Sequence, residues 1–130
     1  MPALTHVVLP ILIAATLPFA ATLCAKLGKL TPRDNLGPRA WQETLDGWRQ
    51  RATWAHQNAF ETFPMFAAAM ILAHLGAPGS ETAVIAAYAY PSFRVLYTAA
   101  FVANQGALRS LMWFASMVAV VTLFVVALRG

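Results

Sequence analysis

Four long apolar segments constrain this chain more than any other feature of its sequence. They cover residues 3–25, 54–75, 82–102 and 111–128. Each is about 18–23 residues long, the length that an α-helix needs to cross roughly 30 Å of hydrocarbon. Lipid cannot satisfy backbone hydrogen bonds, and the segments lack the alternation of a barrel strand, so helices are expected. The predicted helices cover about residues 3–26, 54–75, 81–103 and 108–128.

The composition excludes a typical soluble domain. Of the 130 residues, 59% are hydrophobic and only 11% are charged, whereas about 25% of residues are charged in soluble domains. A chain this short cannot bury so much apolar surface against itself. The same numbers exclude disorder. The length allows one domain, residues 1–130, with lipid as its main solvent.

The connections between the apolar segments predict an all-α, integral membrane four-helix bundle. Residues 76–80 and 103–107 are tight turns, and short turns make neighbouring helices antiparallel. The first connection, 27–53, is long and polar. Within it, Pro38 can begin a short helix whose Trp41, Leu45 and Trp48 would lie on the membrane interface.

The distribution of cations predicts the orientation. Most of the nine Lys and Arg residues lie in or beside the first connection, and Arg109 lies at the same side of the predicted membrane. The positive-inside rule therefore predicts that loop 27–53 is cytoplasmic and that both termini lie on the opposite side. No aromatic–basic platform accompanies these cations, so no nucleic-acid partner is expected. The six cations of the loop are Lys26, Lys29, Arg33, Arg39, Arg49 and Arg51.

Cysteine and histidine give no functional signal. Cys24 is the only cysteine, so an internal disulfide is excluded, and the residue is interpreted as a small buried hydrophobe. No second His or Cys lies at ligand spacing from His56, so no metal site is predicted.

Two charged residues lie within the predicted membrane segments at nearly equal depth. Glu61 is ~10 Å and Arg94 ~12 Å from the cytoplasmic side at 1.5 Å per residue. An isolated charge there costs roughly 2.5–3.5 kcal/mol, so a partner or a water-filled cleft is expected. Two interpretations stay open: a structural Glu61–Arg94 ion pair, and a ligand site that uses both residues.

Further polar residues converge on the same half of the bundle. Asn58 shares a helix face with Glu61, Tyr97 shares one with Arg94, and Arg109 with Ser110 begins the last helix. Arginine can clamp a carboxylate, a carboxylate can receive an ammonium group, and arginine can stabilise a thiolate. Glutathione offers two carboxylates, one amine and one thiol, and therefore suits this set.

Three motifs resemble the MAPEG superfamily, the membrane-associated proteins of eicosanoid and glutathione metabolism. Residues 55–64, AHQNAFETFP, look like the second-helix motif of the family. Residues 94–97, RVLY, look like its third-helix Arg-x-x-Tyr, and residues 108–110, LRS, look like the start of its fourth helix. Residues 38–41 and 47–52 are similar to a bacterial branch.

The resemblance implies a homotrimer in a bacterial inner membrane that uses glutathione as a co-substrate. Glutathione would lie between protomers near the cytoplasmic face. Arg109 would activate its thiolate as the catalytic residue, with Ser110 beside it. The residues expected to hold glutathione are Arg51, Asn58, Glu61, Arg94 and Tyr97.

Two departures from the family pattern are expected to weaken glutathione binding. Phe101 stands where many glutathione-using members have a second tyrosine, and Gln57 stands where some have a basic residue. A charge-assisted contact is worth about 1.5–3 kcal/mol. Losing two contacts could therefore cost a hundredfold or more in affinity.

The sequence favours a glutathione transferase or peroxidase that acts on a small lipophilic electrophile arriving from membrane lipid. The alternative is a non-catalytic MAPEG-fold membrane protein that binds a lipid or a protein partner. A small drug–proton exchanger is a third hypothesis. It is disfavoured because an ion-paired Glu61 would stay ionised and carry protons poorly.

Overall fold

The computed structural model describes residues 2–130, and this part of the chain is all-helical without any strand. Four long helices account for most of it: α1 (Pro2–Lys26), α3 (Gly47–Gly76), α4 (Glu81–Val102) and α5 (Gly106–Arg129). Between α1 and α3 lie a 3-10 turn (Asp34–Leu36) and the short helix α2 (Pro38–Glu43). The predicted all-α fold class is therefore confirmed.

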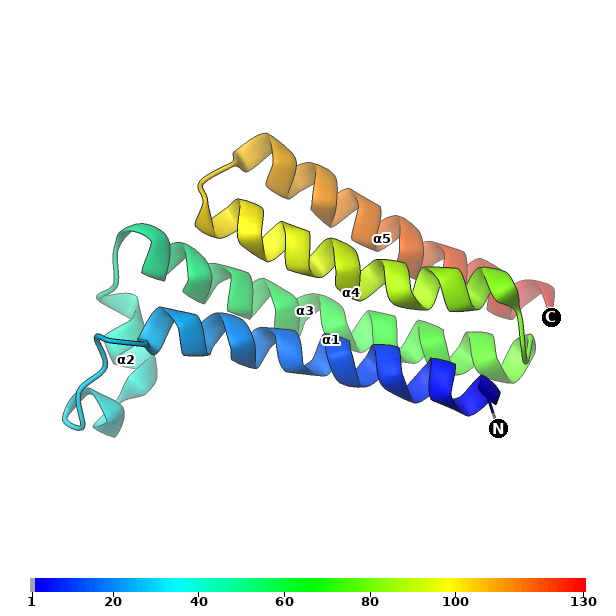
Figure 1. Cartoon of the computed structure of the whole chain (residues 1–130), viewed down its shortest axis with the longest axis horizontal. Coiled ribbons are helices and arrows are strands. Elements are labelled where there is room, and N and C mark those ends of the chain that lie inside the picture. The colour runs from blue at the N-terminus through cyan, green and yellow to red at the C-terminus, as the bar shows by residue number, and fades with distance from the viewer. Residues whose placement is uncertain (1) are drawn as a thin grey trace.

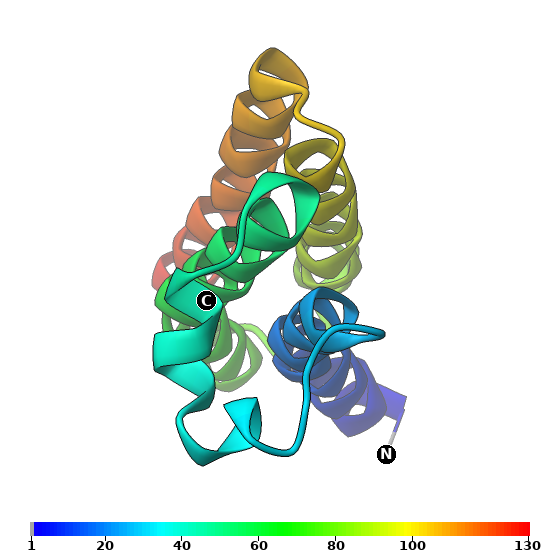
Figure 2. The ribbon, with the colours of Figure 1, turned by 90° about the vertical axis from the view of Figure 1, so that its left-hand side faces the viewer.

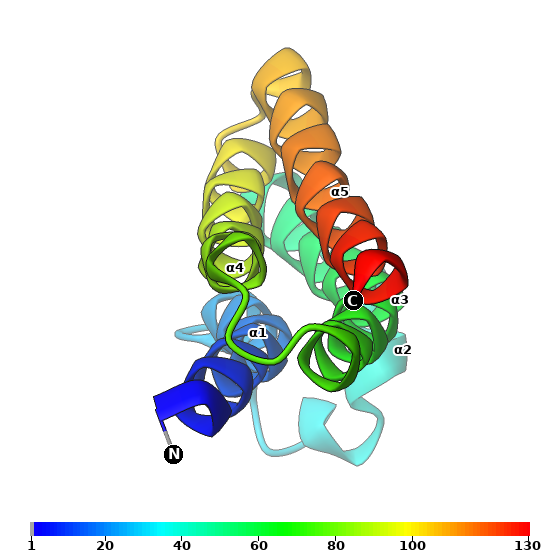
Figure 3. The same ribbon diagram turned by 90° about the vertical axis from the view of Figure 1, so that its right-hand side faces the viewer.

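The four long helices lie side by side, with α3 and α4 in the middle (Figure 1). Each of these two helices contacts the other three long helices, whereas α1 and α5 do not contact each other within residues 2–130. Both termini and the α3–α4 turn lie at one end of the molecule, as the end-on view in Figure 3 shows. The opposite end carries α2 and the α4–α5 turn (Figure 2).

Three helices are long and apolar enough to cross a membrane: α1, α3 and α5. Although α4 has 22 residues, it is not in this set. Its sequence contains Arg94 and all three tyrosines of the chain, which lower its mean hydropathy. Because α4 contacts three other helices, its polar side chains can be buried in protein rather than in lipid.

The core is built largely from small residues. Ala69, Ala73, Ala87 and Ala119 are all buried in the main cluster, together with larger side chains such as Phe66. Small residues let helix backbones approach closely, which is how helices pack in the absence of a hydrophobic driving force from water. The larger apolar side chains of the outer faces stay exposed, as expected for contact with lipid: examples are Leu12, Phe19, Phe114 and Val118.

The first connection is shorter than predicted because α3 begins at Gly47 rather than at residue 54. The predicted stripe of Trp41, Leu45 and Trp48 on one helix is wrong, because α2 ends at Glu43. The Thr44 hydroxyl donates to the Trp41 carbonyl at 2.7 Å where the helix ends. Leu45 is buried with Ala25 and Ala52, and so joins this connection to the ends of α1 and α3 instead of facing the membrane surface.

Gly76 marks the closest approach of α3 and α5. A Cβ atom at this position would lie 2.6 Å from the backbone oxygen of Ala127. We expect Gly76→Ala to push the two helices apart and to destabilise the protein by about 1–3 kcal/mol. Thermal unfolding in detergent measures the effect.

Gly106→Ala is the matched control, because a Cβ atom at Gly106 has no neighbour within 4 Å. This variant should keep or slightly raise the unfolding temperature, since alanine favours helix over glycine. Equal behaviour of the two variants would contradict the close α3–α5 contact.

Candidate ligand site around Arg94

Arg94 lies at the centre of the polar half of the molecule. It is only 2% exposed and reaches from α4 toward α3. Its Nη2 donates to Asn58 Oδ1 at 2.7 Å, and its guanidinium lies over the Tyr97 ring at 4.0 Å from the centroid. Asn58 Nδ2 in turn donates to Glu61 Oε2 at 3.4 Å. These contacts bring together four of the predicted binding residues.

Glu61 does not pair directly with Arg94 in the described part of the chain. Asn58 lies between them and contacts both. The carboxylate of Glu61 is exposed and Asn58 is half-buried, whereas Arg94 is buried. The side-chain amide of Asn58 therefore bridges Glu61 and Arg94 in place of a direct ion pair. The Glu61 carboxylate stays available to another group.

Two nitrogen atoms of Arg94 lack acceptors. Nε and Nη1 are buried and have no hydrogen-bond partner within residues 2–130. An unsatisfied buried donor costs about 1–3 kcal/mol, and more when it is charged. An anionic group that reached these atoms would therefore gain strong, charge-assisted hydrogen bonds.

A contact between α3 and α4 closes the polar region around Arg94 on the side that faces the chain termini. Tyr90 Oη donates to Thr62 Oγ1 at 3.0 Å. The Tyr90 ring stacks on Phe66, with centroids 4.0 Å apart and an interplanar angle of 7°. Tyr90, Phe66 and Thr62 are all buried. They separate the polar half of the molecule from the apolar half that carries the termini.

Arg109 and Ser110 line a small hollow next to Tyr97. The hollow has a volume of about 220 Å³, and Tyr97, Trp113 and Phe114 complete its lining. The Arg109 guanidinium lies 4.8 Å from the Phe101 ring centroid. Tyr97 therefore contacts Arg94 with its ring and lines the hollow of Arg109, so that it links the two arginines.

Phe101 does more than lack a hydroxyl. The sequence places it on the same helix face as Arg94 and Tyr97, and in the structure its ring packs edge-to-face on Tyr97 at 5.7 Å and lies under the Arg109 guanidinium. The spacing of Tyr97 and Phe101 by one helical turn is the signal for the contact between their rings.

Gln57 and Arg51 lie outside this group of contacts. Gln57 lines a separate hollow of about 660 Å³ between α2 and α3, with Arg39 and Glu43. Arg51 Nε donates to the carbonyl of Val102 at 3.1 Å, at the end of α4. Neither side chain forms a hydrogen bond with Asn58, Glu61, Arg94 or Tyr97 within residues 2–130.

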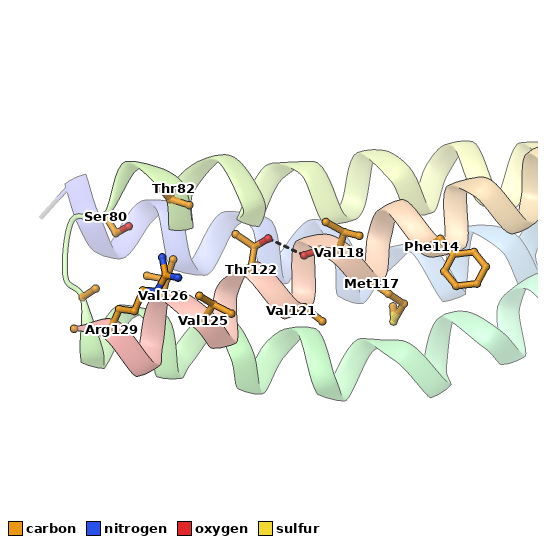
Figure 4. Close-up of a pocket in the computed structure, with 12 residues that line it drawn as sticks. Ser80, Thr82, Phe114, Met117, Val118, Val121, Thr122, Val125, Val126 and Arg129 are labelled. Carbon is orange, nitrogen blue, oxygen red and sulfur yellow. Dashed lines mark hydrogen bonds between the residues drawn. The ribbon is translucent and has the colours of Figure 1, made fainter.

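Another hollow, at the opposite end of the molecule, has a different character. It has a volume of about 610 Å³ and is lined mainly by the apolar face of α5 (Figure 4). Its threonine at position 122 donates to the Val118 carbonyl of its own helix at 2.8 Å. Arg129 is its only charged lining residue among those described. This hollow therefore lacks the mixed charges and unpartnered donors found around Arg94.

Comparison with known families decides which class of protein carries this site. The model of the MAPEG family matches residues 3–129, which is essentially the whole chain. The chain belongs to the MAPEG family. It has no significant match among curated proteins or solved structures. MAPEG membership and the three apolar helices identify an integral membrane protein, with a function related in general terms to glutathione or eicosanoid metabolism.

The Asn58–Arg94 hydrogen bond should contribute measurably to the stability of this MAPEG protein. In Asn58→Ala, Arg94 would lose its hydrogen-bond acceptor while staying buried. We expect destabilisation by about 1.5–3 kcal/mol, the range for hydrogen bonds to charged groups. Thermal unfolding in detergent without added ligand measures it.

Gln57→Ala provides the matched control for this experiment. Gln57 precedes Asn58 on the same helix, but it is exposed and makes no contact with Arg94. It should unfold within about 0.5 kcal/mol of the unmodified protein. If Asn58→Ala were as stable as Gln57→Ala, the bridge from Arg94 to Glu61 would have no structural role.

Proposed function

We propose that this MAPEG protein is a glutathione-binding membrane enzyme of the transferase or peroxidase type. The observation that carries the proposal is buried Arg94, which has two nitrogen atoms without acceptors beside an exposed carboxylate and a second arginine. Glutathione is the co-substrate and supplies the nucleophilic thiol. The expected second substrate is a small lipophilic electrophile from the bilayer.

The charges of the site fit the charges of glutathione. The N–H groups of Arg94 that lack acceptors can donate to a carboxylate, and the guanidinium is stabilised by its contact with the Tyr97 ring. The exposed carboxylate of Glu61 can receive the ammonium group, oriented by its contact with Asn58. These are complementary, charge-assisted contacts at both ends of one small molecule.

Arg109 is the residue we propose as the thiolate stabiliser. Its charge lies at the rim of the hollow that Tyr97 and Ser110 also line. A cation beside a thiol favours the thiolate and lowers the thiol pKa from its usual value of about 8.5. The Ser110 hydroxyl lies next to Arg109 in sequence, is exposed, and can donate a further hydrogen bond at the same place.

The proposed assembly is a homotrimer of four-helix bundles. Glu61 is exposed in a single chain although it belongs to the polar site, so a neighbouring protomer would cover it. In this arrangement α4 would cross the membrane with the other long helices. We place it in a bacterial inner membrane, with the end that carries α2 in the cytoplasm and both termini on the opposite side.

One observation favours the alternative of a non-catalytic MAPEG protein that binds lipid or a protein partner. Arg109 is already in contact with the Phe101 ring, where a tyrosine hydroxyl is absent. If the site does not bind glutathione, this contact would serve only to pack α5 against α4.

The thiolate role of Arg109 can be tested by titrating enzyme-bound glutathione. We expect the purified protein in detergent to show the ultraviolet thiolate band of bound glutathione at neutral pH. In Arg109→Ala the band should appear only near the ordinary thiol pKa of about 8.5. Calorimetry on both proteins reports binding separately from ionisation.

Arg129→Ala removes a cation from the far end of the same helix and is the control. It should keep the thiolate band of the unmodified protein. Absence of glutathione binding at millimolar concentration would overturn the enzyme proposal and support the non-catalytic alternative.

A further inference from the structure

An apolar groove runs between α1 and α4, away from the polar site. It has a volume of about 710 Å³, and no charged side chain lines it. Trp48 lines the groove, and the start of α3 to which it belongs lies at the end of the molecule that carries α2. Its walls include Leu17, Ala21 and Cys24 from α1, and Val95, Ala99 and Val102 from α4.

Two arginines stand at the same end of this groove, one at each wall. Arg49 Nη1 donates to the carbonyls of Ala25 and Leu27 at 2.9 and 2.6 Å, where α1 ends. Arg51 Nε donates to the carbonyl of Val102, where α4 ends. Leu27 and Val102 both line the groove, so the guanidinium groups are fixed beside its mouth.

These arginines keep donors free for another acceptor. Arg49 uses only Nη1 and Arg51 only Nε in hydrogen bonds within residues 2–130. The Arg49 guanidinium also lies over the Trp48 ring at 4.5 Å. Trp48 is 43% exposed, and tryptophan favours the level of lipid headgroups. The end of the groove therefore combines an aromatic ring with two cations.

We propose that this groove binds one anionic phospholipid of the bilayer. An acyl chain lies between α1 and α4, and the phosphate is held between Arg49 and Arg51. Basic pockets between membrane helices suit anionic headgroups, and arginine forms paired hydrogen bonds with phosphate. Arg51 thereby serves the lipid, not glutathione. The proposal rests on the membrane-spanning arrangement but not on any glutathione activity.

The test compares lipid retention by the full-length protein. The protein is purified from nanodiscs that contain equal amounts of phosphatidylglycerol and phosphatidylcholine, and retained lipid is counted by native mass spectrometry. We expect retention of one phosphatidylglycerol, favoured about tenfold or more over phosphatidylcholine. The double variant Arg49→Gln/Arg51→Gln should lose this preference, whereas Arg39→Gln should keep it because Arg39 lines a different hollow. Equal retention of both lipids by the unmodified protein would overturn the proposal.

A second pair of variants keeps both arginines, in case their loss unfolds the helix ends. Ala99→Phe fills the groove and should abolish specific retention. Ile85→Phe places the same ring on an exposed part of α4, which is outside the groove, and should not. If both variants retained phosphatidylglycerol equally, the lipid would lie elsewhere.

Cys24, the only cysteine, is exposed on the groove wall and is not the buried hydrophobe that the sequence predicts, so it offers an independent readout. Its alkylation by a small maleimide should slow severalfold with phosphatidylglycerol relative to phosphatidylcholine. Protection that does not depend on the headgroup would contradict a site specific for an anionic lipid.

Discussion

The burial of Arg94 between α3 and α4 is the interaction on which the rest of the polar half depends. A guanidinium in an apolar helix layer must find hydrogen bonds, or it destabilises the fold. Here it finds one in Asn58 and a ring in Tyr97. The Asn58 contact joins α4 to α3 and also holds Glu61 through the Asn58 amide, whereas the Tyr97 ring supports the guanidinium from within α4.

The tight α4–α5 turn brings the second arginine to the same place. Gln105 N donates to the Ala100 carbonyl at 2.8 Å, and Asn104 has a φ of 59°. The chain can thus reverse within a few residues, and Arg109 returns to Phe101. The guanidinium groups of Arg94 and Arg109 consequently lie against neighbouring aromatic rings of α4, those of Tyr97 and Phe101. This is why a site can form here from three helices, while the opposite half remains hydrocarbon.

Much of this arrangement could be predicted from the sequence, because lipid demands long apolar helices and makes buried charges rare. The depth of Glu61 and Arg94 predicts that they lie in one layer, and in the structure Asn58 forms a hydrogen bond with each of them. Depth is resolved to a helical turn and does not give side-chain direction. For this reason the sequence does not predict the direction of Gln57 or the contact of Phe101 with Arg109, although helical spacing does place Phe101 beside Tyr97. The start of α3 at Gly47 was missed because residues 47–53 are too polar to extend an apolar pattern.

We propose that the unpartnered nitrogens of Arg94 receive the anionic end of glutathione. Nuclear magnetic resonance of the Nε–Hε group of Arg94 tests it most directly, with the signal assigned through an Arg94→Lys variant. This signal should shift on saturation with glutathione, while the signal of Arg129, at the far end of α5, should not. Binding of glutathione that leaves the Arg94 signal unchanged would contradict this role of Arg94.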